Sequence, residues 1–227
     1  MEKACISVDD PREFIRVSAV PDPVPLCPEI RLYQASDAFE LWQKLEDMLG
    51  HQVPPPYWAF CWPGGQALTR YLLDTPDLVR GKRVLDFAAG SGISAVGAAL
   101  AGACCVEAAE IDPLAVTAIS LNAVLNGVTI TPVGGEALGM LDGGWDVVVA
   151  GDVCYERPMA EKVFGWLNDL VERGVTVLMA DPGRTYLPKT GLEKLAAYTV
   201  PTRLDLEDRT FRETSVYRVV GGQRGRS

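Results

Sequence analysis

A glycine-rich turn is the most chemically specific pattern in the sequence. It lies in Val84-Leu85-Asp86-Phe87-Ala88-Ala89-Gly90-Ser91-Gly92-Ile93, between an apolar run typical of a buried strand and the start of a helix. Glycine lets the backbone approach a ligand closely, and the first turn of a helix offers N–H groups without partners. We therefore expect a cofactor site at this turn, lined by Asp86, Ala88, Gly90 and Gly92.

Two kinds of cofactor fit such a turn. The spacing of Gly90, Gly92 and Ala95 also satisfies the GxGxxG/A pattern of dinucleotide-binding folds. Asp86 favours the other kind, because a carboxylate repels a pyrophosphate and attracts the ammonium and sulfonium of S-adenosylmethionine. A third interpretation stays open, in which Asp86 is only the acid of a tight strand-to-helix turn. Charge favours S-adenosylmethionine.

A second acid follows the next apolar run, in Glu110-Ile111-Asp112-Pro113. A carboxylate at the end of the second strand can accept hydrogen bonds from both hydroxyls of a ribose, so we expect Glu110 and its neighbour Ile111 to contact the cofactor. Asp112 precedes Pro113 and equally suits the cap of a helix. Both classes of cofactor need an acid here, so Glu110 does not discriminate between them.

A third pattern, Asp152-Val153-Cys154-Tyr155, follows the apolar run at 146–149. Ligands of open α/β sheets bind beyond the carboxyl ends of the strands, and Asp86, Glu110, Asp152 and Asp181 all stand at such ends. We expect Asp152 and Tyr155 to face a common cleft as the catalytic pair, and Asp152 to contact the cofactor as well. The alternatives are a helix cap for Asp152 and a packed ring with a hydrated hydroxyl for Tyr155.

An aromatic and proline-rich stretch at 54–65 is too rich in proline for the interior of a helix or strand. We expect Trp62 and Gly65 to approach the cofactor. The alternative for the aromatic residues is a lid packed on the core.

The apolar pattern predicts an α/β fold with a Rossmann-like, mostly parallel sheet of seven strands and helices on both faces. Strands are expected at 84–87, 104–109, 129–133, 146–150 and 175–180, with a C-terminal antiparallel hairpin at 198–204 and 211–220. Helices are expected at 37–49 (capped by Ser36), 66–73, 93–101, 113–126 and 159–171, and a short strand at 14–17. We expect one structural domain, in which residues 1–80 form an arm and helices packed on a cofactor-binding core of residues 81–227.

Composition excludes several classes of function. With 21 Lys and Arg against 30 Asp and Glu, the net charge is −9, which disfavours nucleic acids and anionic membranes as partners. The single histidine, His51, and six cysteines without a zinc or disulfide spacing indicate no metal site and a reducing compartment. The uncharged run at 87–106 is rich in Gly, Ala and Ser rather than typical of a membrane span. The first residues lack a signal or transit pattern, so we expect a cytoplasmic monomer.

Together these motifs resemble the class I, seven-β-strand, S-adenosylmethionine-dependent methyltransferases. Asp152-Val153-Cys154-Tyr155 matches the DxxY motif of members that methylate protein lysines. Further segments resemble the lysine methyltransferases of the electron transfer flavoprotein β subunit and their bacterial relatives: Asp10-Pro11-Arg12-Glu13-Phe14-Ile15, Pro28-Glu29-Ile30-Arg31-Leu32, Pro55-Pro56-Tyr57-Trp58-Ala59-Phe60, Trp62-Pro63-Gly64-Gly65-Gln66-Ala67-Leu68 and Ala180-Asp181-Pro182-Gly183-Arg184.

The resemblance implies methyl transfer from S-adenosylmethionine to protein lysines, with the electron transfer flavoprotein β subunit as the expected partner. Asp152 would then capture and orient the lysine, and Tyr155 would direct its lone pair. Related enzymes suggest a ribosomal or other protein amine, or a small nitrogen heterocycle such as nicotinamide, as alternatives. A fold retained only for binding, without turnover, is a further alternative.

Overall fold

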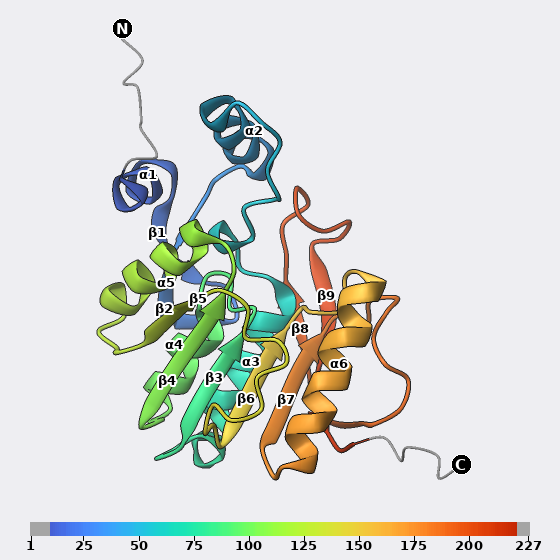
Figure 1. Cartoon of the computed structure of the whole chain (residues 1–227). Coiled ribbons are helices and arrows are strands. Elements are labelled where there is room, and N and C mark those ends of the chain that lie inside the picture. Colours follow the sequence, from blue (N-terminus) through green and yellow to red (C-terminus); the bar gives the residue numbers. More distant parts are fainter. Residues whose placement is uncertain (1–9, 222–227) are drawn as a thin grey trace, which may run out of the picture.

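The computed structural model describes residues 10–221. Its main sheet has seven strands in the order β5-β4-β3-β6-β7-β9-β8 (Figure 1). These are β3 (Arg83–Phe87), β4 (Cys105–Glu110), β5 (Thr131–Gly134), β6 (Val147–Gly151), β7 (Thr176–Asp181), β8 (Leu192–Pro201) and β9 (Phe211–Val219). The first five strands are mutually parallel, and β9 runs antiparallel to both β7 and β8. The predicted α/β fold is confirmed.

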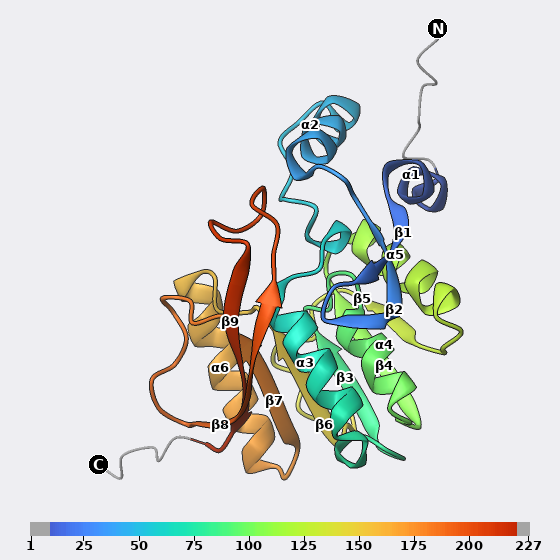
Figure 2. The same ribbon diagram turned by 180° about the vertical axis from the view of Figure 1, so that it is seen from behind.

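Helices cover both faces of the sheet, because successive residues of each buried strand point to opposite faces. On one face, α3 (Pro63–Asp74), α4 (Ile93–Leu100) and α5 (Pro113–Leu125) pack on alternate strand residues such as Val84 and Val149 (Figure 2). On the other, α6 (Arg157–Glu172) packs on the residues between, such as Leu85 and Val148. Two apolar cores therefore hold the sheet in the middle of the molecule.

The segment before the sheet contains α1 (Pro11–Ser18), β1 (Val20–Val24), β2 (Cys27–Gln34), α2 (Ala38–Leu49) and the short 3-10 helices η1 (Tyr57–Ala59) and η2 (Pro76–Leu78). Strands β1 and β2 form a separate antiparallel pair. Asn122 of α5 and Asn126, the C-cap of that helix, bind the backbone of β2 at Tyr33 and Arg31 over 2.7–2.9 Å. Amide side chains thus fasten the N-terminal segment to the core.

The strand predicted at 14–17 is wrong, because these residues lie in α1. Asp10 caps this helix by accepting hydrogen bonds from the amides of Arg12 and Glu13, and Pro11 suits its first turn. Phe14 and Ile15 are fully buried on its inner side. A capped helix of eight residues was too short for its period to be distinguished from a strand.

Three predicted boundaries also need correction. The cap of α2 is Asp37, whose carboxylate accepts from the amide of Glu40 at 2.8 Å, and not Ser36. Helix α3 begins at Pro63 and not at 66, because a proline is tolerated in the first turn of a helix. Strand β8 begins at Leu192 and not at 198; as an edge strand with a single buried residue, it lacks a clear apolar alternation.

The uncharged run at 87–106 is the end of β3, the glycine turn, α4 and the start of β4. Within residues 10–221, no helix has both the length and the apolar character needed to cross a membrane. Helix α3 lies before the predicted boundary at residues 80 and 81 but packs on the sheet. The division into an arm and a core stays a prediction.

Candidate active site

The four acids expected at one edge of the sheet lie there. Asp86 is in β3, Glu110 ends β4, Asp152 directly follows β6 and Asp181 ends β7. The parallel register carries all four to the carboxyl end, since Asp86 is paired with Val149 and Gly151 with Ala180. The topology therefore assembles carboxylates that are up to 95 residues apart in the chain, from 86 to 181.

The glycine turn is held in a strained backbone conformation. Ala88, Gly90 and Gly92 all have positive φ, at 52°, 53° and 77°. For Ala88 this region costs of order 1 kcal/mol or more, which the surrounding contacts must offset. Glu110 braces the turn: its Oε2 accepts from the amide of Gly90 at 2.9 Å, and its Oε1 from that of Ile111 at 2.7 Å.

Asp86 lies beneath this turn rather than at its surface. The residue is 2% exposed, and its Oδ2 accepts from the amide of Ala95 in α4 at 2.9 Å. Burial, with a smaller contribution from the charge of Glu110, raises the pKa of Asp86 to about 8. A carboxyl group that is neutral near pH 7 repels a pyrophosphate weakly. The charge argument by which we favoured S-adenosylmethionine over a dinucleotide is therefore not supported by this geometry.

Asp152 joins the carboxyl end of β6 to the start of α3. It has a φ of +58°, unusual for a residue with a side chain. Its Oδ2 accepts from the amide of Gly65 at 2.9 Å, and its own amide donates to the carbonyl of Ala180 at 3.0 Å. Its Oδ1 lies 3.4 Å from Nη2 of Arg184. The alternative of a helix cap for Asp152 thus holds in part. Its carboxylate caps the N-terminus of α3 and not that of α6, the helix that follows it in sequence.

Two further glycines, Gly64 and Gly151, make this contact possible. A Cβ on Gly64 would lie 2.6 Å from both Oδ2 of Asp152 and the carbonyl oxygen of Ala180. A Cβ on Gly151 would lie 2.9 Å from the amide nitrogen of Gly65. The absence of side chains lets α3 approach the sheet edge, and burial there raises the pKa of Asp152 to about 7, against the opposing effects of Arg184 and Gly65.

Tyr155 stands beside Asp152 in an aromatic group that includes a residue the sequence did not single out. Its ring is 5.9 Å from that of Tyr57, which in turn lies 5.6 Å from the ring of Trp62. Nε1 of Trp62 donates to the carbonyl of Tyr57 at 2.9 Å. Tyr155 is 48% exposed, and burial of its hydroxyl raises its pKa, so it is a neutral phenol near pH 7. It can therefore donate a hydrogen bond.

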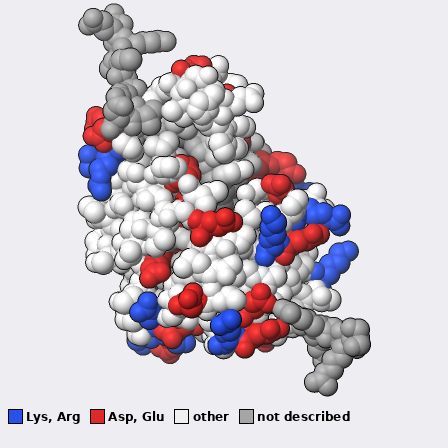
Figure 3. Space-filling view, viewed as in Figure 1, with Lys and Arg blue, Asp and Glu red and all other residues white. Residues whose placement is uncertain are grey.

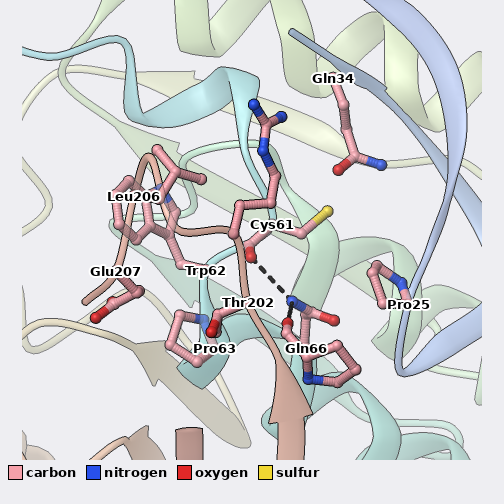
Figure 4. A pocket seen from close by; sticks show the side chains of 11 residues that line it. Pro25, Gln34, Cys61, Trp62, Pro63, Gln66, Thr202, Leu206 and Glu207 are labelled. Carbon is pink, nitrogen blue, oxygen red and sulfur yellow. Dashed lines mark hydrogen bonds between the residues drawn. The ribbon is translucent and has the colours of Figure 1, made fainter. Parts of the chain in front are cut away.

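Two hollows lie near these residues. One, of ≈ 320 Å³, is lined by Tyr155, Pro182, Gly183, Arg184, Thr185, Tyr186 and Arg212. The other, of only ≈ 30 Å³, lies between Trp62, Gln66 and the β8–β9 connection, where Nε2 of Gln66 donates to the carbonyls of Cys61 and Pro201 (Figure 4). The larger hollow has room for a side chain beside Tyr155, whereas the smaller one holds at most a water molecule.

The structure thus brings the predicted residues into two neighbouring groups. The first contains the glycine turn with Asp86 and Glu110; the second contains Asp152, Gly65, Trp62 and Tyr155. The two are adjacent, because a Cβ on Gly90 would lie 3.9 Å from the carbonyl oxygen of Tyr57, and the charge of Glu110 contributes to the raised pKa of Tyr155. The space-filling view shows a depression in the surface below α2, with acidic side chains around it (Figure 3).

Comparison with known proteins gives this site its class. The family profile "Ribosomal protein L11 methyltransferase (PrmA)" matches residues 66–153, which include the glycine turn. The electron transfer flavoprotein beta subunit lysine methyltransferase of Danio rerio is 35% identical over 219 residues, covering 93% of this chain and 84% of the relative. The Rattus norvegicus protein of the same name is 40% identical over 182 residues, covering 78% and 71%. The chain belongs to this family.

The methyltransferase uses S-adenosylmethionine, and its fold is that of proteins seen with this cofactor. Magnesium protoporphyrin IX methyltransferase from Synechocystis with bound S-adenosylmethionine is 20% identical, covers 70% of this chain and 78% of its own, and superposes with a TM-score of 0.51. This likeness concerns the fold. Membership of the methyltransferase family makes S-adenosylmethionine, and not a dinucleotide, the cofactor, as predicted.

The residues of the glycine turn fit S-adenosylmethionine. A Cβ added to Gly90 would be in ordinary van der Waals contact with the carbonyl oxygen of Tyr57, at 3.9 Å, and would meet no closer atom, so the turn is not crowded. Glu110 accepts three backbone amides, two at Oε1 and one at Oε2, so Oε2 keeps a lone pair for a ribose hydroxyl. Ile111 is 69% exposed next to it, a large apolar side chain on which an adenine ring can pack.

Proposed function

We propose that this methyltransferase transfers methyl groups to lysine side chains of the electron transfer flavoprotein β subunit. The carrying observation is the position of Asp152 and Tyr155, three residues apart in the chain, directly after the carboxyl end of β6. Oδ1 of Asp152 is held only by a long contact of 3.4 Å to Arg184, and Tyr155 is half exposed over the adjoining hollow. A carboxylate and a phenol in this arrangement suit a primary amine, and the names of the relatives supply the protein that carries it.

We assign Asp152 the capture and orientation of the lysine. The arriving side chain is an ammonium with a pKa of about 10.4, and its deprotonation costs about 1.4 kcal/mol for each pH unit below that value. The hydroxyl oxygen of Tyr155 then accepts a hydrogen bond from an N–H of the neutral amine, which leaves the nitrogen lone pair free and directed at the methyl group. Bound S-adenosylmethionine supplies the electrophilic methyl group, and the proton lost by the lysine goes to water. Positioning by Asp152 and Tyr155 supplies most of the acceleration.

We assign cofactor binding to the glycine turn and its supports. Asp86 and Ala95 fix the turn from below, and Glu110 binds the ribose. Ala88, Gly90 and Gly92 shape the backbone, with Ile111 against the adenine. Trp62 and Gly65 are proposed to close the methionine end, although the amide of Gly65 is already engaged by Asp152.

The site of action is proposed to be a reducing compartment such as the cytoplasm, where the protein acts as a monomer and without nucleic acid. Support comes from the net charge of −9 and from five free thiols within residues 10–221. Light scattering of the purified protein tests the oligomeric state, and a mass near twice that of one chain would contradict it.

The test of function is the intact mass of purified electron transfer flavoprotein after incubation with this protein and S-adenosylmethionine. We expect the β subunit to gain mass in methyl increments. Asp152→Ala should abolish the gain while retaining S-adenosylhomocysteine binding by calorimetry, whereas Asp142→Ala, which removes an exposed carboxylate, should retain both. If the β subunit gains no mass with a protein that binds S-adenosylhomocysteine, the proposed substrate is wrong.

A further inference from the structure

Arg184 connects Asp152 to an acid from a distant part of the chain. Its Nη2 lies 2.8 Å from Oε1 of Glu207 and 3.4 Å from Oδ1 of Asp152. All three side chains are largely buried, with exposures of 23% for Arg184, 4% for Glu207 and 13% for Asp152. Nε of Arg184 is buried and has no hydrogen-bond partner among the described residues. The guanidinium is thus a buried cation shared by two carboxylates.

The protein holds this cation from both sides. After β7 the chain turns through Gly183, whose φ is +84°, and Oδ1 of Asp181 accepts from the amides of Gly183 at 2.7 Å and Arg184 at 2.6 Å. Glu207, in the β8–β9 connection, is fixed by Arg212, whose Nε and Nη2 donate to Oε2 at 3.1 and 3.0 Å. Arg184 is therefore held more closely by Glu207, at 2.8 Å, than by Asp152, at 3.4 Å.

Asp152 faces charges of both signs. Arg184 and the amide of Gly65, at the N-terminus of α3, favour its ionised form, whereas burial and the carboxylate of Asp181 oppose it. The remaining titratable and charged groups around the pair are the thiol of Cys154, the phenols of Tyr155 and Tyr57, and Glu207 with its partner Arg212, which also pairs with Asp208. Arg184 is the cation in contact with Asp152, so its loss would leave burial and Asp181 opposed only by Gly65.

We propose that Arg184 is a positioning residue for methyl transfer, which keeps Asp152 ionised and oriented toward the incoming lysine. This inference rests on the proposed function. The 3.4 Å contact is long for a charged hydrogen bond, so Oδ1 of Asp152 can bind an ammonium while Arg184 stays anchored on Glu207. The positive charge of Arg184 near that ammonium also favours loss of its proton.

The test compares Arg184→Gln and Arg184→Lys by the pH dependence of kcat/KM on the β subunit. An opposite charge at this distance lowers the pKa of a carboxylate by about 1–3 units. Arg184→Gln is therefore expected to move the midpoint of the rise in rate to higher pH by about that amount, and raising the pH should restore much of the loss. Arg184→Lys keeps the charge and is expected to keep a midpoint close to that of the wild type. Arg218→Gln removes an arginine paired with Glu193 on the outer strands and serves as the matched control.

A second measurement keeps the inference separate from the choice of substrate. NMR titration of the Asp152 carboxyl carbon, assigned with Asp152→Asn, needs no methyl acceptor. The carboxyl is expected to titrate at higher pH in Arg184→Gln than in the wild type. If the wild type does not methylate the β subunit, the proposed function fails, and the titration alone then tests whether Arg184 keeps Asp152 ionised. An Asp152 titration unchanged by Arg184→Gln, or a rate lowered by one factor at every pH, would show a merely structural role and overturn the inference.

Discussion

The amide of Gly65 donates a hydrogen bond of 2.9 Å to Oδ2 of Asp152. Gly65 is the third residue of α3, so the carboxylate lies at the N-terminus of that helix, where unpaired amides and the helix dipole stabilise negative charge. The bond orients Asp152 and leaves Oδ1 on the side of Arg184. A backbone group on a helix that precedes the cofactor turn in sequence thus fixes the residue that we assign to lysine capture.

Replacing Gly64 tests this close approach. In Gly64→Ala the new Cβ would lie 2.6 Å from Asp152 and from the carbonyl of Ala180, so α3 must move away. We expect the free energy of unfolding to fall by about 1–3 kcal/mol and methyl transfer to fall with it. In the control Gly165→Ala, nothing lies within 4 Å of the new Cβ, and this exposed helical position should gain roughly 0.5–1 kcal/mol. Urea denaturation of the wild type and both variants measures these free energies of unfolding. A Gly64→Ala variant as stable as the wild type would contradict the crowding at Gly64.

Removing the hydroxyl of Tyr155 separates catalysis from binding. Tyr155→Phe keeps the ring beside Tyr57 but removes the hydrogen bond that we assign to the lysine nitrogen. We expect kcat to fall by at least about tenfold, equivalent to about 1.4 kcal/mol of transition-state stabilisation, with S-adenosylhomocysteine affinity and stability unchanged. Tyr217→Phe in β9 is the control. A kcat equal to that of the wild type would leave Tyr155 as a packed aromatic residue only.

Glu110 should affect cofactor binding first. Glu110→Ala removes the acceptor of the amides of Gly90 and Ile111, together with the proposed ribose contact. Charge-assisted hydrogen bonds contribute about 1.5–3 kcal/mol each, so we expect S-adenosylhomocysteine to bind roughly 10- to 100-fold more weakly by calorimetry. Glu161→Ala removes an exposed acid of α6 and should bind like the wild type. Unchanged affinity in Glu110→Ala would exclude the ribose contact.

Asp86 makes stability depend on pH. Its pKa is raised from an ordinary value near 4 to about 8, so between these values the folded chain holds a proton that the unfolded chain releases. This contribution to stability is present at low pH and is lost as the pH rises to 8, with a slope of at most about 1.4 kcal/mol per pH unit. Asp86→Asn removes it.

The stability of Asp86→Asn relative to the wild type should therefore increase from pH 5 to pH 8. Guanidinium denaturation at several pH values measures this difference, with Asp142→Asn as an exposed control. A difference that is constant across this range would mean that Asp86 stays ionised in the folded protein.

Local patterns were sufficient to predict the sheet, most helices and the residues at its carboxyl edge. The strands β3, β6 and β7 are buried on both faces, so their apolar runs stand out, and the acids that follow them lie at one edge because parallel strands end together. The glycine turn could also be predicted from the sequence, since the positive φ at Gly90 and Gly92 favours glycine.

Only the tertiary structure determined which groups meet at these residues. Arg184 and Glu207 are 23 residues apart, and Gly65 and Asp152 are 87 apart, so no local pattern relates them. The burial of Asp86 beneath the turn was equally invisible, because the sequence places a carboxylate at a strand end without showing which way it faces. The short-range periodicity of the sequence alone thus determined the fold class and the position of the acids at the carboxyl edge of the sheet. Their protonation and partners depend on packing between distant segments.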